Sequence, residues 1–487
     1  MTRDKVLVVG DLMLDRRIEG TMTRISPEAP VPIVRARDFY QAPGGAGNLA
    51  ANLAALFDPS YSRGTPKVRV LGVCGGDQAA TDLTRLITES GCALKMAHAP
   101  MGMTTVKTRI TCAGQQILRI DGQEDELSSD SVLRTHLENA LHDNTDVGAV
   151  VLVDYGRGAL QPELSQWLMG TCAALTIPVF ADVKPAQHTF SAYRHASLFR
   201  CNLQEAVAIS TALGLCHPAL LQGSDEDKAI CAARALRTVG GFGTVVITMG
   251  AAGCLYHDVM NFGYIKTTPA PVYDVTGAGD TFMAALVTSL LQNYGLEEAC
   301  KRANVAAGIA VSQRGTYIVS DDEWQDAIEA VRGWDAKIIT LAGAQQRAER
   351  KRRQGKKVVL ANGCFDLLHH GHLHMLAEAR EQGDVLFVAT NMDESIRALK
   401  GEGRPVIPGP ERLRALAQFA AVDYVLFFDG DMEAVVRAIR PDVLVKGCEY
   451  EGTVVPGADW VAKHGGVLYF GGMVPGYSTT KIEQVEG

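Results

Sequence analysis

A glycine-rich turn before an apolar helical run carries the first residues whose types and spacing suit chemistry. The turn is Thr276-Gly277-Ala278-Gly279. At a helix start, the backbone N–H groups of Gly277, Ala278 and Gly279 would form an anion site. Asp280 would repel a phosphate there unless it takes the proton from a hydroxyl that attacks the phosphoryl group. Asp also caps helices readily, so the motif alone leaves both interpretations open.

A second reactive segment is ANGCFDLLHHGHLHMLAEARE at 361–381, which follows a strand-like run and contains four histidines. Imidazoles bind zinc and copper, but no set of carboxylates or cysteines at ligand spacing completes a metal site. His369, Gly371 and His372 form an H-x-G-H pattern. The glycine lets the backbone approach a triphosphate, and two imidazoles near a helix start can stabilise charge on an α-phosphate as pyrophosphate leaves.

Short β-branched runs alternate with helical segments and must position these motifs. This alternation predicts βα units on a parallel sheet that is covered on both faces. Residues 104–121, with a turn at Ala113-Gly114, instead resemble a hairpin, which with residues 30–36 we interpret as a small β lid. The predicted core strands are 5–10, 67–75, 147–154, 177–182 and 244–250, and after a break 357–363, 384–391, 423–428, 441–447 and 466–472.

The break between the two sets of strands divides the chain. We expect a first α/β domain at 1–335, a basic linker at 336–356 and a second α/β domain at 357–487. Residues 347–357 contain seven Lys or Arg, which invites an RNA-binding interpretation. Because no aromatic residues are interleaved, a solvated helix or linker is favoured.

Composition excludes several classes of protein. With 47% hydrophobic and 21% charged residues the 487-residue chain is globular, and its net charge of −8 argues against nucleic-acid binding over the whole surface. The eleven cysteines form no C-x-x-C pair, as is typical of reduced thiols in the cytoplasm. The N-terminal apolar run is too short for a signal peptide, and no run reaches the roughly 20 residues of a membrane span.

Several motifs accompany Asp280. They are GDLMLD at 10–15, PGGAGN at 43–48, NLQE at 202–205 and TMGAAG at 248–253. Together with DVTGAGDT they resemble the ribokinase-like carbohydrate kinases over about residues 5–330. The segment GGAGNLA matches a dinucleotide fingerprint poorly because it follows no clean strand, and the chain has no P-loop motif.

The resemblance implies a role for each matching residue. Asp280 is the general base, and the N–H groups of Gly277, Ala278 and Gly279 are the anion hole. Asn202 and Glu205 organise Mg²⁺–ATP, with Glu205 acting on the metal indirectly, and Lys184 neutralises phosphate. The implied ATP contacts are Asn202, Leu203, Gln204, Glu205, Thr248, Gly250 and Gly253, and the implied sugar contacts are Asp11, Asp15, Gly44, Gly45 and Asn48.

Residues 357–487 resemble the cytidylyltransferase-like nucleotidyltransferases, with a Rossmann-like α/β fold. This implies that His369 and His372 are catalytic. Glu449 stands where that family's motif has Asp, which leaves its role open. The implied ATP contacts are Gly363, Cys364, Phe365, Asp366, Gly371, Lys446, Ser478, Thr479 and Thr480.

The fusion of these two domains resembles the bifunctional heptose 7-phosphate kinases and heptose 1-phosphate adenylyltransferases of Gram-negative bacteria. The segment RISPEAPVP at 24–32 strengthens the match. The resemblance implies that ATP phosphorylates O1 of D-glycero-β-D-manno-heptose 7-phosphate and that a separate phosphatase removes the 7-phosphate. AMP transfer then gives ADP-heptose for the lipopolysaccharide core. The expected cofactor is Mg²⁺ with ATP, and no prosthetic group, membrane or nucleic acid is expected.

Alternatives remain at this stage. The second domain could be a CTP-dependent polyol-phosphate cytidylyltransferase, and the whole chain could be a non-catalytic sugar-responsive regulator. Arg24, Lys107, Arg109 and Arg119 are candidates for holding the 7-phosphate, although basic residues on a β lid are usually just solvated. Because a lid hairpin often pairs between subunits, we expect a homodimer.

Overall fold

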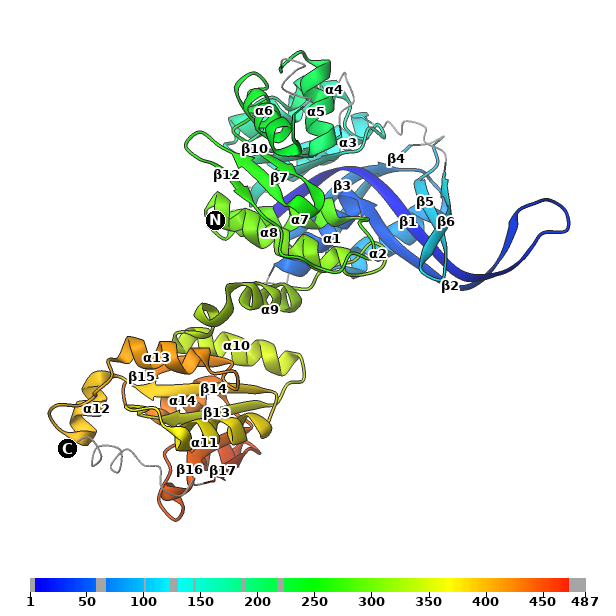
Figure 1. The fold of residues 1–487 in the computed structure, drawn as a ribbon. Helices are drawn as coiled ribbons and strands as arrows, with labels where there is room; N and C mark the ends of the chain where they lie inside the picture. The colour runs from blue at the N-terminus through cyan, green and yellow to red at the C-terminus, as the bar shows by residue number, and fades with distance from the viewer. Residues whose placement is uncertain are drawn as a thin grey trace. The chain divides into compact units, whose positions relative to one another are not determined.

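The computed structural model describes residues 5–57, 67–99, 102–122, 130–142, 146–184, 190–216 and 223–472. The chain forms two compact units, Met1–Gln325 and Asp326–Gly487. Figure 1 shows the elements of both.

The first unit is built on a twisted, mainly parallel sheet. Its strands follow the order β12-β11-β10-β9-β8-β7-β1-β3-β4, and only β11 and β12, at one edge, pair antiparallel. The strands are β1 (Lys5–Ile25), β3 (Val68–Cys74), β4 (Ala93–His98), β7 (Val147–Asp154), β8 (Val179–Val183), β9 (Leu198–Asn202), β10 (Thr244–Thr248), β11 (Cys254–His257) and β12 (Phe262–Ile265).

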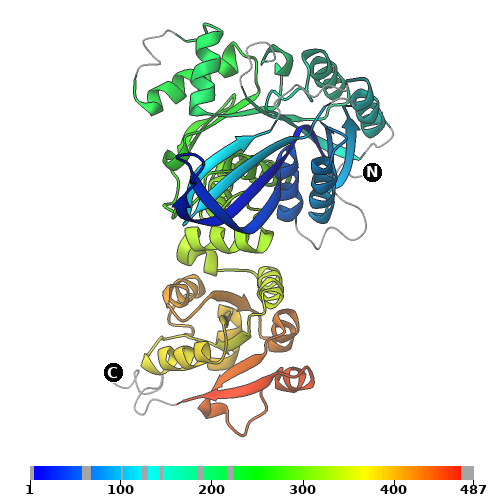
Figure 2. The same cartoon turned by 90° about the vertical axis from the view of Figure 1, so that its right-hand side faces the viewer.

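Helices cover both faces of this sheet (Figure 2). Leu7 and Val9 of β1 belong to the apolar core that the sheet forms with helices α3 to α6. Helices α1 and α7 do not contribute to that core and pack against each other. Successive side chains of a buried strand point to opposite faces, which explains the uniformly apolar runs in the sequence. The helices are α1 (Ala46–Leu56), α2 (Gln78–Glu89), α3 (Asp130–His142), α4 (Pro162–Ala174), α5 (Leu203–Ala212), α6 (Asp225–Thr238), α7 (Ala278–Leu291) and α8 (Leu296–Val311).

The predicted β lid is present, but its first strand differs from the prediction. Rather than ending near residue 10, β1 continues to Ile25 and passes from the main sheet into the lid (Figure 1). There it pairs with β2 (Pro32–Gly45) and β5 (Thr105–Cys112), and β5 forms the expected hairpin with β6 (Gln115–Asp121). The strand continues because Asp11 and Asp15 remain in extended, paired backbone.

The register of the lid separates an apolar face from a basic one. Ile18 pairs with Phe39 and Ile110, and Ile110 pairs with Leu118, so these four residues lie on one face. The residues one position away along each of these strands point their side chains to the opposite face of the lid. That face carries Asp15, Arg17, Lys107, Arg109, Arg119 and Asp121.

The second unit contains a five-stranded parallel sheet in the order β15-β14-β13-β16-β17. Val358 and Leu360 of β13 pack under α10 and α14, whereas Val359 and Ala361 pack under α11 and α13. The strands are β13 (Val358–Gly363), β14 (Val385–Asn391), β15 (Tyr424–Phe428), β16 (Val443–Gly447) and β17 (Val467–Gly471). The helices are α10 (Leu341–Arg353), α11 (His370–Glu381), α12 (Asp393–Lys400), α13 (Gly409–Gln418), α14 (Met432–Ile439) and α15 (Ala458–Lys463).

The segment predicted as a basic linker at 336–356 is instead part of the second unit. Most of it is α10, whose Ala344 and Ala348 are fully buried, and the boundary between the units falls earlier, within α9 (Asp321–Arg332). The basic side chains have acidic partners: Arg350 binds Asp326 and Glu329, and Lys351 binds Asp326. The basic run therefore stabilises this unit and offers few free cations to RNA.

Among the described residues, no helix is both long and apolar enough to cross a bilayer.

Glu329 should be important for the stability of the second unit. Its side chain is only 16% exposed and contacts Arg347, Arg350 and the hydroxyl of Tyr424. Glu329→Gln should lower the free energy of unfolding of this unit by about 3 kcal/mol, because the buried Arg350 loses one of its two carboxylate partners and Arg347 loses the carboxylate that it binds. Urea unfolding of the full chain, monitored by hydrogen exchange of the backbone amides in β13 and β14, measures this loss of stability. The exposed ion pair between Glu433 and Arg437 is the matched control. Glu433→Gln should lower the free energy of unfolding by only about 0.5 kcal/mol. Equal losses in the two variants would contradict the prediction.

Candidate functional site

The glycine-rich turn places backbone donors and a buried carboxylate at the start of α7. Gly277 has φ 75° and precedes the helix, and a Cβ there would lie 2.7 Å from the Nδ2 atom of Asn48. Ala278 and Gly279 begin the helix, and Asp280 lies in its first turn with only 4% of its surface exposed. The turn therefore needs glycine both for its conformation and for the close approach of Asn48.

Two hydrogen bonds fix the carboxylate of Asp280. The Tyr155 hydroxyl donates to Oδ1 and the Asn48 amide donates to Oδ2, both at 2.8 Å. Burial, followed by the negative charge of Asp182, raises the pKa of Asp280 to about 6, and the two hydrogen bonds oppose this shift. A carboxylate in this pKa range can accept a proton from a hydroxyl near neutral pH.

Tyr155 was not identified from the sequence. It directly follows β7, and the ammonium groups of Lys184 and Lys107 lie 4.2 and 5.4 Å from the centre of its ring. Its place at the carboxyl end of a central strand, where open α/β sheets bind ligands, is the signal that could have identified it.

Asp15 lies beside the predicted glycine loop. Its Oδ1 atom accepts a hydrogen bond from Arg109 at 2.9 Å and its Oδ2 from Thr316 at 3.1 Å. A Cβ on Gly44 would lie 2.8 Å from Oδ2, and Gly45 precedes α1 with φ 55°. The structure thus brings Asp15, Gly44 and Gly45 together.

Asp11 and Asn48, both predicted to bind sugar, have internal partners instead. The Asp11 carboxylate is 2% exposed and accepts backbone N–H bonds from Tyr155, Arg157 and Ala159, and burial raises its pKa to about 6. Asn48 is fully buried and holds Asp280. In this geometry they position the loop after β7 and the carboxylate of α7.

The predicted ATP segments meet at the same edge of the sheet. Asn202 and Glu205 form a reciprocal capping box at the start of α5, which Leu203 and Gln204 begin. Thr248 ends β10, and the turn that follows contains Gly250 with φ 58° and Gly253 with φ 113°. A Cβ on Gly253 would collide with the carbonyl oxygen of Ile265.

In the second unit, β13 leads through Gly363, Cys364 and Phe365 into α11. The rings of His369 and His372 stack with centroids 3.8 Å apart, and the edge of the Phe365 ring lies against His372. The Nδ1 atoms of both histidines are buried and have no hydrogen-bond partner within the described part of the chain. The H-x-G-H motif therefore presents two adjacent imidazoles at the start of a helix.

Burial controls the charge of these imidazoles. It lowers the pKa of His369, and together with the neighbouring His369 it lowers the pKa of His372 to about 4. Lys446 is 8% exposed at the end of β16, with its ammonium 4.6 Å from the centre of the Tyr450 ring. The negative charge of Glu449 opposes the lowering of the pKa of His369 and of Lys446, both of which burial lowers.

The side chain of Asp366 binds a neighbouring loop and does not face an open surface. It is 1% exposed and binds the Arg404 side chain and the Val406 N–H. Arg412, missed from sequence, is equally buried and donates to the carbonyl of Cys364 and the hydroxyl of Thr390. Both side chains fix the segment that contains the motif. Ser478, Thr479 and Thr480 lie outside the described residues.

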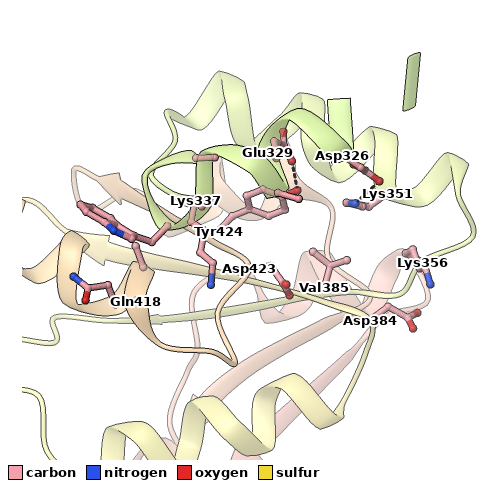
Figure 3. Close-up of a pocket in the computed structure, with 15 residues that line it drawn as sticks. Asp326, Glu329, Lys337, Lys351, Lys356, Asp384, Val385, Gln418, Asp423 and Tyr424 are labelled. Carbon is pink, nitrogen blue, oxygen red and sulfur yellow. Dashed lines mark hydrogen bonds and ion pairs between the residues drawn. The ribbon is translucent and has the colours of Figure 1, made fainter. Parts of the chain in front are cut away.

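A separate cavity of about 640 Å³ lies in the second unit at the opposite edge of the sheet (Figure 3). Val385 and Tyr424, the first residues of β14 and β15, line it, whereas His369 follows the carboxyl end of β13. In its lining, Lys351 pairs with Asp326, and the Tyr424 hydroxyl donates a hydrogen bond to Glu329. The cavity is therefore distinct from the histidine site.

Comparisons with family models match both halves of the chain. The model described as pfkB family carbohydrate kinase matches residues 3–323, and the cytidylyltransferase-like model matches residues 360–467. The predicted fold class is confirmed for both domains.

Relatives match nearly the whole chain. The bifunctional protein HldE of Alkalilimnicola ehrlichii is 39% identical over 484 residues, covering 98% of this chain and 96% of its own. That of Pseudomonas aeruginosa is 38% identical over 479 residues, with coverages of 98% and 96%. That of Acidiphilium cryptum is 38% identical over 486 residues, with coverages of 99% and 95%.

Solved structures resemble the first unit. Phosphofructokinase-2 from Escherichia coli has a TM-score of 0.53 and 20% identity, and covers 68% of this chain and 100% of its own. A complex of the same enzyme with substrates and products has a TM-score of 0.52, 19% identity and coverages of 67% and 99%. These likenesses concern the fold alone.

His372 should titrate near pH 4, well below the usual 6.5, in nitrogen-15 NMR of histidine-labelled protein. Because the folded pKa is depressed, the stability gained from the neutral ring is present above pH 6.5 and is lost as the pH falls towards 4. Phe365→Ala should admit water and move the His372 pKa back upwards. A wild-type His372 that titrates near 6.5 would contradict the burial argument.

Proposed function

Because this chain belongs to the pfkB family of carbohydrate kinases and to the family of the bifunctional proteins HldE, we propose heptose phosphates as its substrates. The chain is an enzyme with a carbohydrate kinase domain and a nucleotidyltransferase domain. The observation that carries the proposal is the presence of two separate phosphate-chemistry sites in one chain: a buried carboxylate at the start of α7 and paired neutral imidazoles at the start of α11.

In the proposed kinase step, Asp280 takes the proton from the O1 hydroxyl of D-glycero-β-D-manno-heptose 7-phosphate. The O1 atom then bonds to the γ-phosphorus of ATP as the bond to the β,γ-bridging oxygen breaks, which gives ADP and the 1,7-bisphosphate. The N–H groups of Gly277, Ala278 and Gly279 stabilise charge on the transferring group. Tyr155 and Asn48 support this step, because they hold both oxygens of the base.

The basic face of the lid supports a sugar that carries a phosphate. Lys107, Arg109 and Arg119 share this face with Asp15, and we propose that they surround the 7-phosphate while Asp15 orients sugar hydroxyls. Arg119 already pairs with Asp121 and Arg109 with Asp15, so both guanidinium groups have a carboxylate partner before the phosphate binds. Arg24 follows Asp15 by nine residues, about 30 Å of extended strand, and we place it outside this site.

The donor set suits Mg²⁺ bound largely through ATP. Among the described residues, no group of three or more His, Cys, Asp or Glu could hold a metal ion, and Mg²⁺ in kinases typically keeps waters and binds phosphates. One oxygen of Glu205 accepts the Asn202 N–H, and we propose that the other reaches Mg²⁺ through water. When bound, the ion neutralises charge on the β- and γ-phosphates.

In the proposed second reaction, an oxygen of heptose 1-phosphate bonds to the α-phosphorus of ATP and pyrophosphate leaves. His369 and His372 are neutral at pH 7 and can donate hydrogen bonds, and Lys446 adds positive charge. Gly363, Cys364, Phe365 and Gly371 shape the site, and contacts from 478–480 remain a prediction. The product is ADP-heptose, and a separate phosphatase must act between the two steps. The cytoplasm is the proposed location, consistent with free thiols at all eleven cysteines.

The decisive test supplies the purified chain with heptose 7-phosphate, Mg²⁺–ATP and a heptose bisphosphate 7-phosphatase, and measures ADP-heptose. Asp280→Asn should slow bisphosphate formation by about 10²–10⁴-fold while adenylyl transfer to heptose 1-phosphate continues, and His372→Asn should have the converse effect. Near-normal kinase turnover in Asp280→Asn would refute the assignment of the base. A preference for CTP would instead support a cytidylyltransferase, and absence of both reactions would support a regulator.

The apolar face of the lid supports a homodimer. Phe39 and Leu118 are 71% and 51% exposed and belong to the row across β2, β1, β5 and β6 described above. A monomer seldom exposes such a contiguous apolar surface. Sedimentation should give twice the 52.2 kDa of one chain. The double variant Phe39→Ser, Leu118→Ser should sediment as a monomer, whereas the pair Val259→Ser, Met260→Ser, exposed outside the lid, should not. A monomeric wild type would refute the dimer.

A further inference from the structure

Arg200 is a buried cation in the kinase unit to which neither the motifs nor the proposed mechanism gives a role. It lies in β9, two residues before Asn202, and only 9% of its surface is exposed. A Cβ built on Gly279 would lie 2.8 Å from both terminal nitrogens of Arg200. The guanidinium therefore packs directly against the backbone of the proposed anion hole.

Side chains from two neighbouring strands aim this guanidinium. Nη1 donates to both oxygens of Asp182, at 3.2 and 3.1 Å, and Nη2 donates to the Thr248 hydroxyl at 2.8 Å. Asp182 is in β8 and Thr248 ends β10, so Arg200 is held from both sides. A guanidinium fixed in this way loses little freedom when a ligand binds.

The hydrogen-bonding capacity of Arg200 is not exhausted. Its Nε atom is buried and has no hydrogen-bond partner among the residues that the structure describes. Arginine carries five N–H donors, and a buried donor without a partner is destabilising. The terminal nitrogens, which lie against Gly279, each carry two N–H groups, so each can donate to an anion there in addition to Asp182 or Thr248.

The charges around Arg200 point the same way. The negative charges of Asp182 and Glu205 favour the charged form of Arg200, Arg200 in turn lowers the pKa of Asp280, and phosphate would add further negative charge. Backbone N–H groups at a helix start supply roughly half a positive charge. The positive charge of Arg200, which lies against Gly279, adds to the partial positive charge of the helix start and so offsets more of the surrounding negative charge.

We propose that Arg200 binds the phosphoryl group in transfer, with Asp182 and Thr248 as its positioning residues. This inference rests on the proposed kinase reaction and adds a catalytic residue to it. As the bond from O1 to the γ-phosphorus forms and that to ADP breaks, the guanidinium donates hydrogen bonds to the non-bridging oxygens, and the O1 proton goes to Asp280.

The same charge acts on the base. Asp280 faces Asp182, Tyr155, Asn48 and Arg200, and Arg200 lowers the pKa of Asp280 against burial and Asp182, which raise it. Loss of the guanidinium charge should therefore raise the pKa of the base. The acid limb of the kinase pH profile, expected near pH 6, should then move to higher pH.

The test compares Arg200→Met and Arg200→Lys in the full chain, with heptose 7-phosphate and saturating Mg²⁺–ATP. The Met variant should lose about 10²–10³-fold in kcat with the KM for heptose 7-phosphate little changed, and its acid limb should move upwards. The Lys variant should recover about tenfold and restore the limb. Arg85→Met, which removes an exposed ion pair on α2, should behave as wild type. Adenylyl transfer in the same samples should stay at wild-type rates.

Three outcomes would overturn the role of Arg200: kcat of the Met variant within threefold of wild type, equal losses in the Met and Lys variants, or a loss confined to the KM for the sugar. If the kinase unit of the Met variant unfolds, faster hydrogen exchange of the β9 amides will show it. The Lys variant, which keeps the positive charge, then tests the role of Arg200 through its kcat and its pH profile. A wild type that does not phosphorylate heptose 7-phosphate refutes the proposed function itself, which is a different result.

Discussion

The first unit depends on one buried carboxylate placed at the positive end of a helix. Asp280 is 4% exposed, yet Tyr155 and Asn48 each donate a hydrogen bond to it. Burial favours the protonated form and the donors favour the ionised form, and the balance leaves a pKa of about 6. A more exposed carboxylate would be a weaker base, and a buried one without donors would remain protonated at neutral pH.

Much of the surrounding structure maintains this balance. Asp11 binds three backbone N–H groups after β7 and so fixes the loop from which Tyr155 reaches Asp280. Gly277 allows the close approach of Asn48. Asp11 and Asn48, which the sequence predicts as sugar contacts, thus hold the loop of Tyr155 and the carboxylate of Asp280. The second unit uses burial differently: it keeps His372 neutral, and it also encloses Lys446 at the end of β16.

The net charge of −8 is consistent with two phosphate-binding sites because attraction depends on local structure. Helix starts, glycine-rich turns and a few buried cations face the proposed ligands. The most basic segment of the chain does not, since Arg350 and Lys351 are paired with Asp326 and Glu329. The charge of a segment was therefore a poor guide to its partner, because the partner was another segment of the same unit.

The sequence by itself determined the two α/β folds, the lid hairpin and the places of both motifs, because strand periodicity and turn chemistry are local properties. The tertiary structure decided the length of β1, the boundary within α9, the internal partners of Asp11 and Asn48, and the roles open to Tyr155 and Arg200. Each depends on contacts between residues far apart in the chain, such as Tyr155 with Asp280 and Arg200 with Gly279. No local pattern records such contacts, since they form only when the carboxyl ends of several strands meet at one edge of the sheet.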